Sequence, residues 1–482
     1  MCGQNGGHGE GAVAPLTFGP NAPEFRANET AEDLSMTLTR HLGQFVAELS
    51  PNRLPEAAAR VARMGFIDTI GTMIAGRNED SVRILTETLA PGAGPATLTF
   101  GDRKAPAPEA AWINGTAAHA LDYDDVGLRG HPSTVLVPAI LAEAETLGAS
   151  GADMITAYVA GYEVWTECFR RDSGLLHQKG WHPTGLYGAV GAAAACAKLR
   201  KLDAEKSAMA IALGASQAAG VMANFGTMTK PFHAGRSAHA GIMAARLAEA
   251  GFTANTDALE HPQGFLHAIS PTGTEDRTSE PKAGKEWAIL TQGLGIKKYP
   301  TCYCTHRAID CMLDLVHNSP IKAEQVETIT VNISDYFATV LRNHQPDTGL
   351  AAKFSMEFCM ASGIVAQRVG LRELTDEFVR RPDIQDLMRK VDIVTTNEYD
   401  PDLPGAAPQD QVAVTLTDGR TIEGEPVARA TGHAVRPLSD QQLYDKFADC
   451  LDAGRSAIPA EVLFRRLSSI QSISARDLTA RA

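Results

Sequence analysis

The segment 186–197, L-Y-G-A-V-G-A-A-A-A-C-A, is apolar on nearly every side when it is wound as a helix. Such a helix is stable only where other helices surround it, because it leaves no polar face for solvent. Alanine and glycine are abundant along the chain, and aromatic residues make up only 6% of it. The sequence therefore favours closely packed helices in a large domain over a β sandwich.

Helical periodicity extends over most of the first 284 residues. Apolar positions recur every three to four residues, and Gly, Asp and Pro occupy the short breaks between these stretches. We expect a long helix that starts at 54–56, followed by helices at 108–119, 135–147, 151–169, 183–199, 204–220 and 234–250.

The pattern changes after residue 284. Apolar and polar residues alternate at 325–333, as in a half-buried strand, and 391–395 is a second candidate strand. The dipeptide Asp418-Gly419 stands between two further candidate strands, which is typical of a hairpin turn. The expected hairpin strands are 411–416 and 420–423, and the expected helices are 306–317, 353–368, 440–452 and 460–472.

A chain of 482 residues is too long for a single core. We predict a mainly α fold with a smaller α+β domain: a large all-helical domain, 36–290, is interrupted by an α+β lid domain, 291–432. The C-terminal helices, 433–482, are expected to pack back on the first part and complete the helical domain. Residues 1–35 are predicted to be a disordered leader, and the active site is expected between the two domains.

Composition excludes several classes of function. The net charge of −13 argues against nucleic acid as a partner, although a local cluster of cations could still bind a small anion. No apolar run is long enough to span a membrane, and the N-terminus has no signal-peptide pattern. The eight cysteines include no C-x-x-C pair, which indicates free thiols in a reducing compartment. We therefore expect a cytoplasmic protein.

The segment 118–133, A-H-A-L-D-Y-D-D-V-G-L-R-G-H-P-S, crowds carboxylates and imidazoles together. Carboxylates this close repel each other unless a cation offsets them. Asp122 and His131 could act as an acid–base pair, with Asp122 and Asp125 on one helix face. Two other interpretations stay open: a divalent metal site that includes Asp124, and a solvated helix end with an ion pair to Arg129.

A second segment, G-W-H-P-T-G at 180–185, places His182 directly before a proline that suits the first turn of a helix. A helix N-terminus favours anions and lowers the pKa of a nearby histidine. His182 could bind a substrate carboxylate or act as a base. The structural alternative is a polar cap on a buried helix.

A third segment, 226–239, carries four possible cations, including Lys230, Arg236 and His239. Lys230 is expected in a loop, and Arg236 and His239 three positions apart on one helix face. Their apolar flanks suggest a cleft that holds a di- or tricarboxylate, although solvated surface charge remains an alternative.

A fourth segment, 297–307, lies at the start of the second domain and offers Lys298, Cys302 and His306. We expect these residues to bind an anion. Covalent catalysis by Cys302 with His306 is conceivable but less favoured, and an ordinary hinge is the structural alternative.

The chain contains no glycine-rich nucleotide fingerprint, Walker motif, G-x-S-x-G or H-E-x-x-H. The four segments supply carboxylate, imidazole and ammonium groups instead. They indicate proton transfer on a small anionic polycarboxylate, with no organic cofactor and no metal.

These motifs together resemble the MmgE/PrpD family, whose members dehydrate 2-methylcitrate, decarboxylate cis-aconitate or epimerise iminodisuccinate. The resemblance covers about 38–472, and its motifs are N-G-T-A-A-H-A-L-D-Y-D-D, H-P-S, G-W-H-P-T-G, T-K-P-F-H-A-G-R-S-A-H-A-G and K-Y-P-T-C-Y-C-T-H-R-A-I-D. It implies a helical domain with an α+β lid, a homodimer, and a further site histidine in the segment 302–306. It also implies that the catalytic residues are Asp122, His131, His182 and Lys230.

Two positions depart from the decarboxylase pattern. A threonine and a tyrosine of that pattern are matched here by Val126 and Phe358. A lost hydroxyl changes which substrate group a polar site can hold. We therefore expect a cofactor-independent lyase, first of all a hydro-lyase acting on a 2-methylcitrate-like acid, with an epimerase or a decarboxylase as alternatives. A metal-dependent hydrolase and a non-catalytic carboxylate-binding protein are hypotheses from other classes.

Overall fold

Helix α7 (Pro183–Leu199) is buried along almost its whole length, as its apolar sequence predicts. Neighbouring helices approach it closely because small residues face it. A Cβ added to Gly191 would lie 2.9 Å from the carbonyl oxygen of Gly161 in α6 (Gly151–Phe169), and one added to Gly241 in α9 (Thr229–Glu249) would lie 2.3 Å from Cβ of Ala192. Larger side chains would therefore force these helices apart.

The computed structural model describes residues 37–403 and 405–480, so the predicted leader at 1–35 lies outside the described residues. From Thr37 onward the chain forms one compact unit. The domain boundaries predicted near 290 and 432 stay a prediction. Among the described residues, no helix is both long and apolar enough to cross a membrane.

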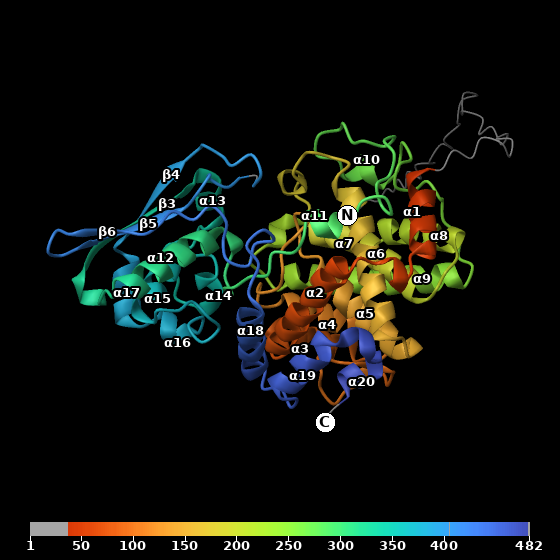
Figure 1. The fold of residues 1–482 in the computed structure, drawn as a ribbon, viewed down its shortest axis with the longest axis horizontal. Coiled ribbons are helices and arrows are strands. Elements are labelled where there is room, and N and C mark those ends of the chain that lie inside the picture. Colours follow the sequence, from red (N-terminus) through yellow and green to blue (C-terminus); the bar gives the residue numbers. More distant parts are fainter. Residues whose placement is uncertain (1–36, 404, 481–482) are drawn as a thin grey trace, which may run out of the picture. The chain divides into compact units, whose positions relative to one another are not determined.

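The structure confirms a mainly α fold with a smaller α+β portion (Figure 1). Several helix boundaries differ from those expected. One helix ends at Ser216, and another begins at Thr229, which places Lys230 in a first helical turn instead of a loop. Proline is tolerated in a first turn, so Pro231 does not prevent this earlier start. The helix expected at 353–368 spans Met356–Val365, and the one expected at 460–472 ends at Ser468. The other long helices of the mainly α part are α1 (Leu38–Glu48), α2 (Glu56–Gly76), α3 (Asp80–Leu89), α4 (Ala107–His119), α5 (Ser133–Leu147) and α8 (Ala204–Ser216).

A two-stranded antiparallel sheet, β1 (Ala96–Thr97) with β2 (Lys104–Ala105), interrupts these helices. No strand was expected at these positions. Each strand is only two residues long, which is too short for an alternating pattern to be visible.

The helices described above share one hydrophobic core, and a second hydrophobic core lies against a four-stranded sheet. The strand order of this sheet is β4-β3-β5-β6. Strand β3 (Val326–Ser334) is parallel to β4 (Val391–Thr396) and antiparallel to β5 (Gln411–Leu416). The expected hairpin turn joins β5 to β6 (Thr421–Glu423), with Gly419 at a φ of 88°. Helices of this part are α12 (His306–Asn318), α13 (Asp335–Val340), α14 (Gly349–Ala352), α15 (Met356–Val365), α16 (Asp376–Val379) and α17 (Pro382–Met388).

After the sheet, the chain returns to the first core. Helix α18 (Asp440–Ala453) packs on α2, and Phe447 of α18 is buried against Gly71 of α2. Helices α19 (Ala460–Ser468) and α20 (Ala475–Thr479) follow and contact α2 and α5. The C-terminal helices therefore pack on helices that precede and follow the segment 118–133.

Candidate active site

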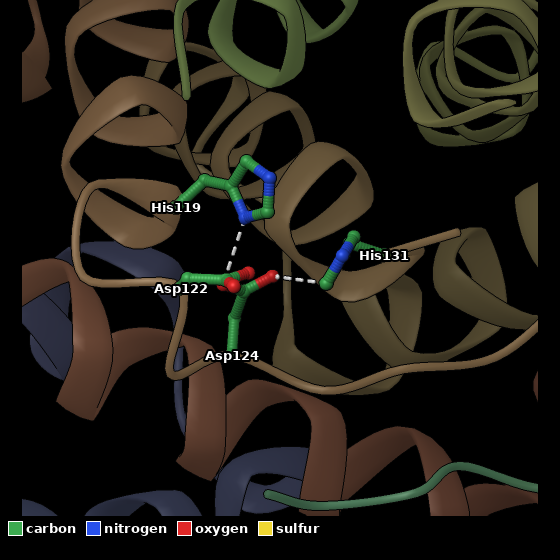
Figure 2. Close-up of side chains that lie close together, drawn as sticks. All are labelled: His119, Asp122, Asp124 and His131. Atoms are coloured by element: carbon green, nitrogen blue, oxygen red, sulfur yellow. Dashed lines mark hydrogen bonds and ion pairs between the residues drawn. The ribbon is translucent and has the colours of Figure 1, made fainter. Parts of the chain in front are cut away.

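The turn after α4 gathers four polar side chains. Helix α4 ends at His119, and Asp122 has a φ of 52°, a left-handed conformation that L-residues adopt rarely. Figure 2 shows His119, Asp122, Asp124 and His131 facing one another, with ligand-type atoms within 4.8 Å of one another. Because the helix ends before the carboxylates, Asp122 and Asp125 do not share a helix face, and that expectation is wrong.

Asp124 lies between two imidazoles. Its Oδ1 is 2.8 Å from Nδ1 of His119, and its Oδ2 is 3.0 Å from Nδ1 of His131. Nδ1 of His131 is also 2.8 Å from the carbonyl oxygen of Asp125, towards which its N–H is directed. Burial opposes ionisation of Asp124, but the two imidazoles outweigh it and lower the pKa of this carboxyl. Burial lowers the pKa of His119 to about 4, so this imidazole is neutral at pH 7.

Asp122 pairs with two lysines from distant segments. Nζ of Lys230, in the first turn of α9, is 2.7 Å from Oδ1 of Asp122, and Nζ of Lys297 is 3.1 Å from the same oxygen. Burial by itself raises the pKa of Asp122, but the two ammonium groups hold it well below its usual range. Asp122 is therefore an ionised carboxylate fixed by two cations.

Asp125 faces away from this cluster. Its Oδ2 accepts a hydrogen bond of 2.7 Å from Oγ of Ser133, which in turn lies 2.6 Å from the hydroxyl of Tyr158. Burial and the neighbouring carboxyls of Asp68 and Asp124 raise the pKa of Asp125 well above its usual value. Asp125 thus lies apart from the cluster and contacts Ser133 at the start of α5.

His182 is the N-cap residue of α7 and precedes Pro183, as expected. Its Nδ1 is 3.1 Å from Nδ1 of His233, and its ring is stacked on His119 with centroids 6.1 Å apart. Burial, together with the positive charge of Lys230 and the other imidazoles, lowers the pKa of His182 well below 6.5. His233 is the fourth of the possible cations counted in the segment 226–239, and no site role was predicted for it.

Arg236 and His239 share a face of α9, as their spacing predicts. Nη1 of Arg236 is 2.8 Å from Nδ1 of His239, and both side chains lie against the ring of Trp112. Within the described chain, the contacts of these two residues do not bring them to Asp122 or His131.

The segment before α12 contributes a lysine that the sequence analysis did not select. Lys297 reaches Asp122, whereas Lys298 lies 3.4 Å from Asp310 and against the ring of Tyr299. The two lysines are adjacent, and nothing in the sequence tells which one points inward. Lys297 is the buried one.

Cys302 and His306 do not form a nucleophile–base pair. The thiol of Cys302 interacts with that of Cys304, which lowers the pKa of Cys302. Nε2 of His306 lies 3.3 Å from the carbonyl oxygen of Thr301, and burial lowers the pKa of His306 to about 3. His306 is therefore a neutral, buried side chain.

A cavity of about 360 Å³ opens beside His131. Burial lowers the pKa of His177, one of its lining residues, to about 4. None of the described residues around this cavity is acidic, and it is large enough for a small polycarboxylate. Its polar lining comprises Arg129, His131, His177, Gln292, Tyr303, Tyr336 and His433.

Two matches to family sequence patterns cover most of the chain. The MmgE/PrpD N-terminal domain matches residues 40–277, and the MmgE/PrpD C-terminal domain matches residues 299–463. The chain therefore belongs to the MmgE/PrpD family.

Three curated relatives are cis-aconitate decarboxylases. Those of Mus musculus and Homo sapiens are each 26% identical to this chain, over 429 and 433 residues. That of Aspergillus terreus is 25% identical over 439 residues. Each match covers 85% of this chain and between 86% and 88% of the relative.

Proposed function

We propose that this protein is a cofactor-independent lyase that acts on a small di- or tricarboxylate by proton transfer next to a carboxylate. The observation that carries the proposal is that Lys230 and His131 both lie close to Asp122, and that His131 lines a cavity with no acidic residue in its described lining. The site combines fixed charge, neutral imidazoles and space for an anion, which general acid–base catalysis requires. The family and the lyase activity named for the relatives support the same class.

His131 is the proposed proton-transfer residue. Its Nδ1 contacts the carbonyl oxygen of Asp125 and the carboxylate of Asp124. The other ring nitrogen, Nε2, is therefore left for the substrate in the cavity. Nε2 takes a proton from the carbon next to a carboxylate, and the electron pair of that C–H bond forms a double bond as the leaving group departs. Lys230, oriented by Asp122, donates a proton to the departing hydroxyl, so that water is released.

Dehydration of a 2-methylcitrate-like hydroxy acid is the first specific reaction that we propose. It needs both a base and an acid, and His131 and Lys230, which both lie close to Asp122, meet this need. Val126 and Phe358 stand where the decarboxylase pattern has hydroxyl groups, which also favours a different reaction.

Decarboxylation of a cis-aconitate-like acid is the second candidate, and the names of the relatives favour it. In that reaction the C–C bond to a carboxylate breaks, CO2 leaves, and the remaining carbanion takes a proton from the protonated form of His131 or from Lys230. The same residues serve both reactions, so the substrate groups that the cavity holds decide between them.

An NMR assay in D2O tests the proposal. The purified protein is incubated separately with 2-methylcitrate, cis-aconitate, citrate and iminodisuccinate, and dehydration, loss of CO2 and deuterium uptake are followed together. Dehydration of a hydroxy acid supports the first reaction, and release of CO2 from cis-aconitate replaces it with the second. Deuterium uptake by iminodisuccinate alone would indicate an epimerase, and absence of all three would contradict proton transfer on these acids.

A metal-dependent hydrolase fits the geometry less well. His119, Asp122, Asp124 and His131 are close enough to hold an ion, but Asp125 faces away from them. Two ammonium groups already compensate the charge of Asp122.

A homodimer and a cytoplasmic location remain parts of our proposal. Light scattering tests the first, and cell fractionation tests the second.

A further inference from the structure

Three consecutive carbonyl oxygens of the turn after α4 each accept a hydrogen bond from a different lysine. Lys353 donates to Leu121 at 3.0 Å, Lys297 donates to Asp122 at 2.6 Å, and Lys446 donates to Tyr123 at 2.7 Å. The three lysines come from the segment after α14, the segment before α12 and helix α18. The turn that carries Asp122 is therefore fixed through its main chain by three separate parts of the chain.

Lys353 has a second connection, which is made by its main chain. Its own carbonyl oxygen accepts a hydrogen bond of 2.8 Å from the N–H of Cys302. Lys353 thus joins the segment around Cys302 to the turn at Leu121, and only 6% of the residue is exposed. Asp122, the next residue, has the left-handed φ of 52°, which persists only where the surroundings hold it.

We propose that Lys353 is a positioning residue that holds Asp122 in its reactive orientation through the carbonyl group of Leu121. The inference rests on the proposed function, in which Asp122 orients Lys230. The ammonium group keeps the 121–122 peptide in place, so that the carboxylate of Asp122 meets Lys230 and Lys297.

The energetics of burial support this role. Burial lowers the pKa of Lys353 to about 8, against the attraction of Glu79 and Asp122, so the fold accommodates this charge at a cost. A well-packed apolar side chain of similar size is often as stable as a buried charge. A lysine retained at such a position is better explained by its effect on the turn than by its contribution to stability.

The test compares Lys353→Met with a matched control, Lys390→Met. Nζ of Lys390 also donates to a main-chain oxygen of the α+β part, that of Val326 at 2.6 Å, but on β3 instead of the turn. We expect Lys353→Met to lower kcat about a hundredfold with little change in KM, because misplaced catalytic groups affect the chemical step most. Lys390→Met should keep kcat within about threefold of the wild type. Near-normal kcat in Lys353→Met, or equal losses in both variants, would overturn the proposal.

Two further measurements separate this inference from the proposed function. Hydrogen exchange of the peptide that spans 120–127 should become faster in Lys353→Met and not in Lys390→Met, whatever substrate the enzyme uses. Unchanged exchange there overturns the positioning role, whereas faster exchange in a protein that turns over none of the four acids contradicts only the proposed function. In Lys353→Ala, which leaves room for a small cation, added propylammonium should restore part of kcat, and absence of rescue counts against the role.

Discussion

Nζ of Lys230 and Oδ1 of Asp122 lie 2.7 Å apart although the two residues are 108 positions apart in the sequence. The contact joins the first turn of α9 to the turn after α4 and is almost completely shielded from solvent. Shielded ion pairs keep a fixed geometry because water does not compete for either partner. The pair therefore delivers an ammonium group with a defined direction next to His131.

Removing either Lys230 or His131 should abolish most of the activity. We expect Lys230→Ala and His131→Ala each to lower turnover by at least about a hundredfold, the range attributed to a positioned acid or base. Steady-state kinetics on the acid identified by NMR gives the turnover, and circular dichroism shows whether the fold survives. If either folded variant retains near-normal turnover, that residue has no role in proton transfer.

Much of the fold could be predicted from the sequence, because long helices carry a repeated signal. Helices α6 and α7 begin and end at the residues that the pattern indicates, and strands β3 and β5 lie where alternation predicts them. Helix α9 begins at Thr229, five residues before the start expected at 234, because a proline is tolerated in the first helical turn. Short elements such as β1 contain too few residues for any periodicity.

The site was only partly predictable, because side-chain direction depends on tertiary contacts. The sequence identified Asp122, His131, His182 and Lys230 as candidates, and the structure brings them close to one another, while their roles remain predictions. The sequence could not show that Lys297 points towards Asp122 while Lys298 points towards Asp310, since two adjacent lysines cannot be told apart without their tertiary contacts. Likewise, nothing local shows that Asp125 turns towards Ser133.

The two carboxylates Asp122 and Asp125 should respond differently to the same substitution. Asp122→Asn removes a charge that two lysines compensate, so we expect turnover to fall at least about a hundredfold. Asp125→Asn changes a carboxyl that faces Ser133 and whose pKa burial raises, so turnover and Tm should stay close to those of the wild type. Steady-state kinetics and thermal unfolding are measured for both variants. A large loss of turnover in Asp125→Asn would show that the carboxylate of Asp125 is functional.

Removal of metal ions should leave the activity unchanged. Lys230 and Lys297 supply the positive charge next to Asp122 that a divalent ion would otherwise provide. The measurement is turnover after dialysis against EDTA, together with elemental analysis of the dialysed protein. Activity that disappears on dialysis and returns with Zn²⁺ or Mn²⁺ would instead favour the metal-dependent alternative.

His306 should make the protein more sensitive to acid. Burial lowers its pKa from 6.5 to about 3, so between these values the unfolded chain binds a proton that the folded protein does not. The stability that this group contributes is present above pH 6.5 and is lost as the pH falls towards 3. Between pH 7 and pH 5 the loss amounts to about 2 kcal/mol relative to a variant without the imidazole.

Urea unfolding of the wild type and of His306→Gln at the two pH values measures this difference. The free energy of unfolding should fall more steeply with acidification in the wild type than in the variant. His317→Gln, a substitution of an exposed residue on the same helix, is the matched control and should keep the wild-type pH dependence. If the free energy of unfolding falls equally with pH in the wild type and in His306→Gln, His306 accepts a proton in the folded protein. In that case Nδ1 of His306, which has no hydrogen-bond partner in the described structure, finds an acceptor when it is protonated.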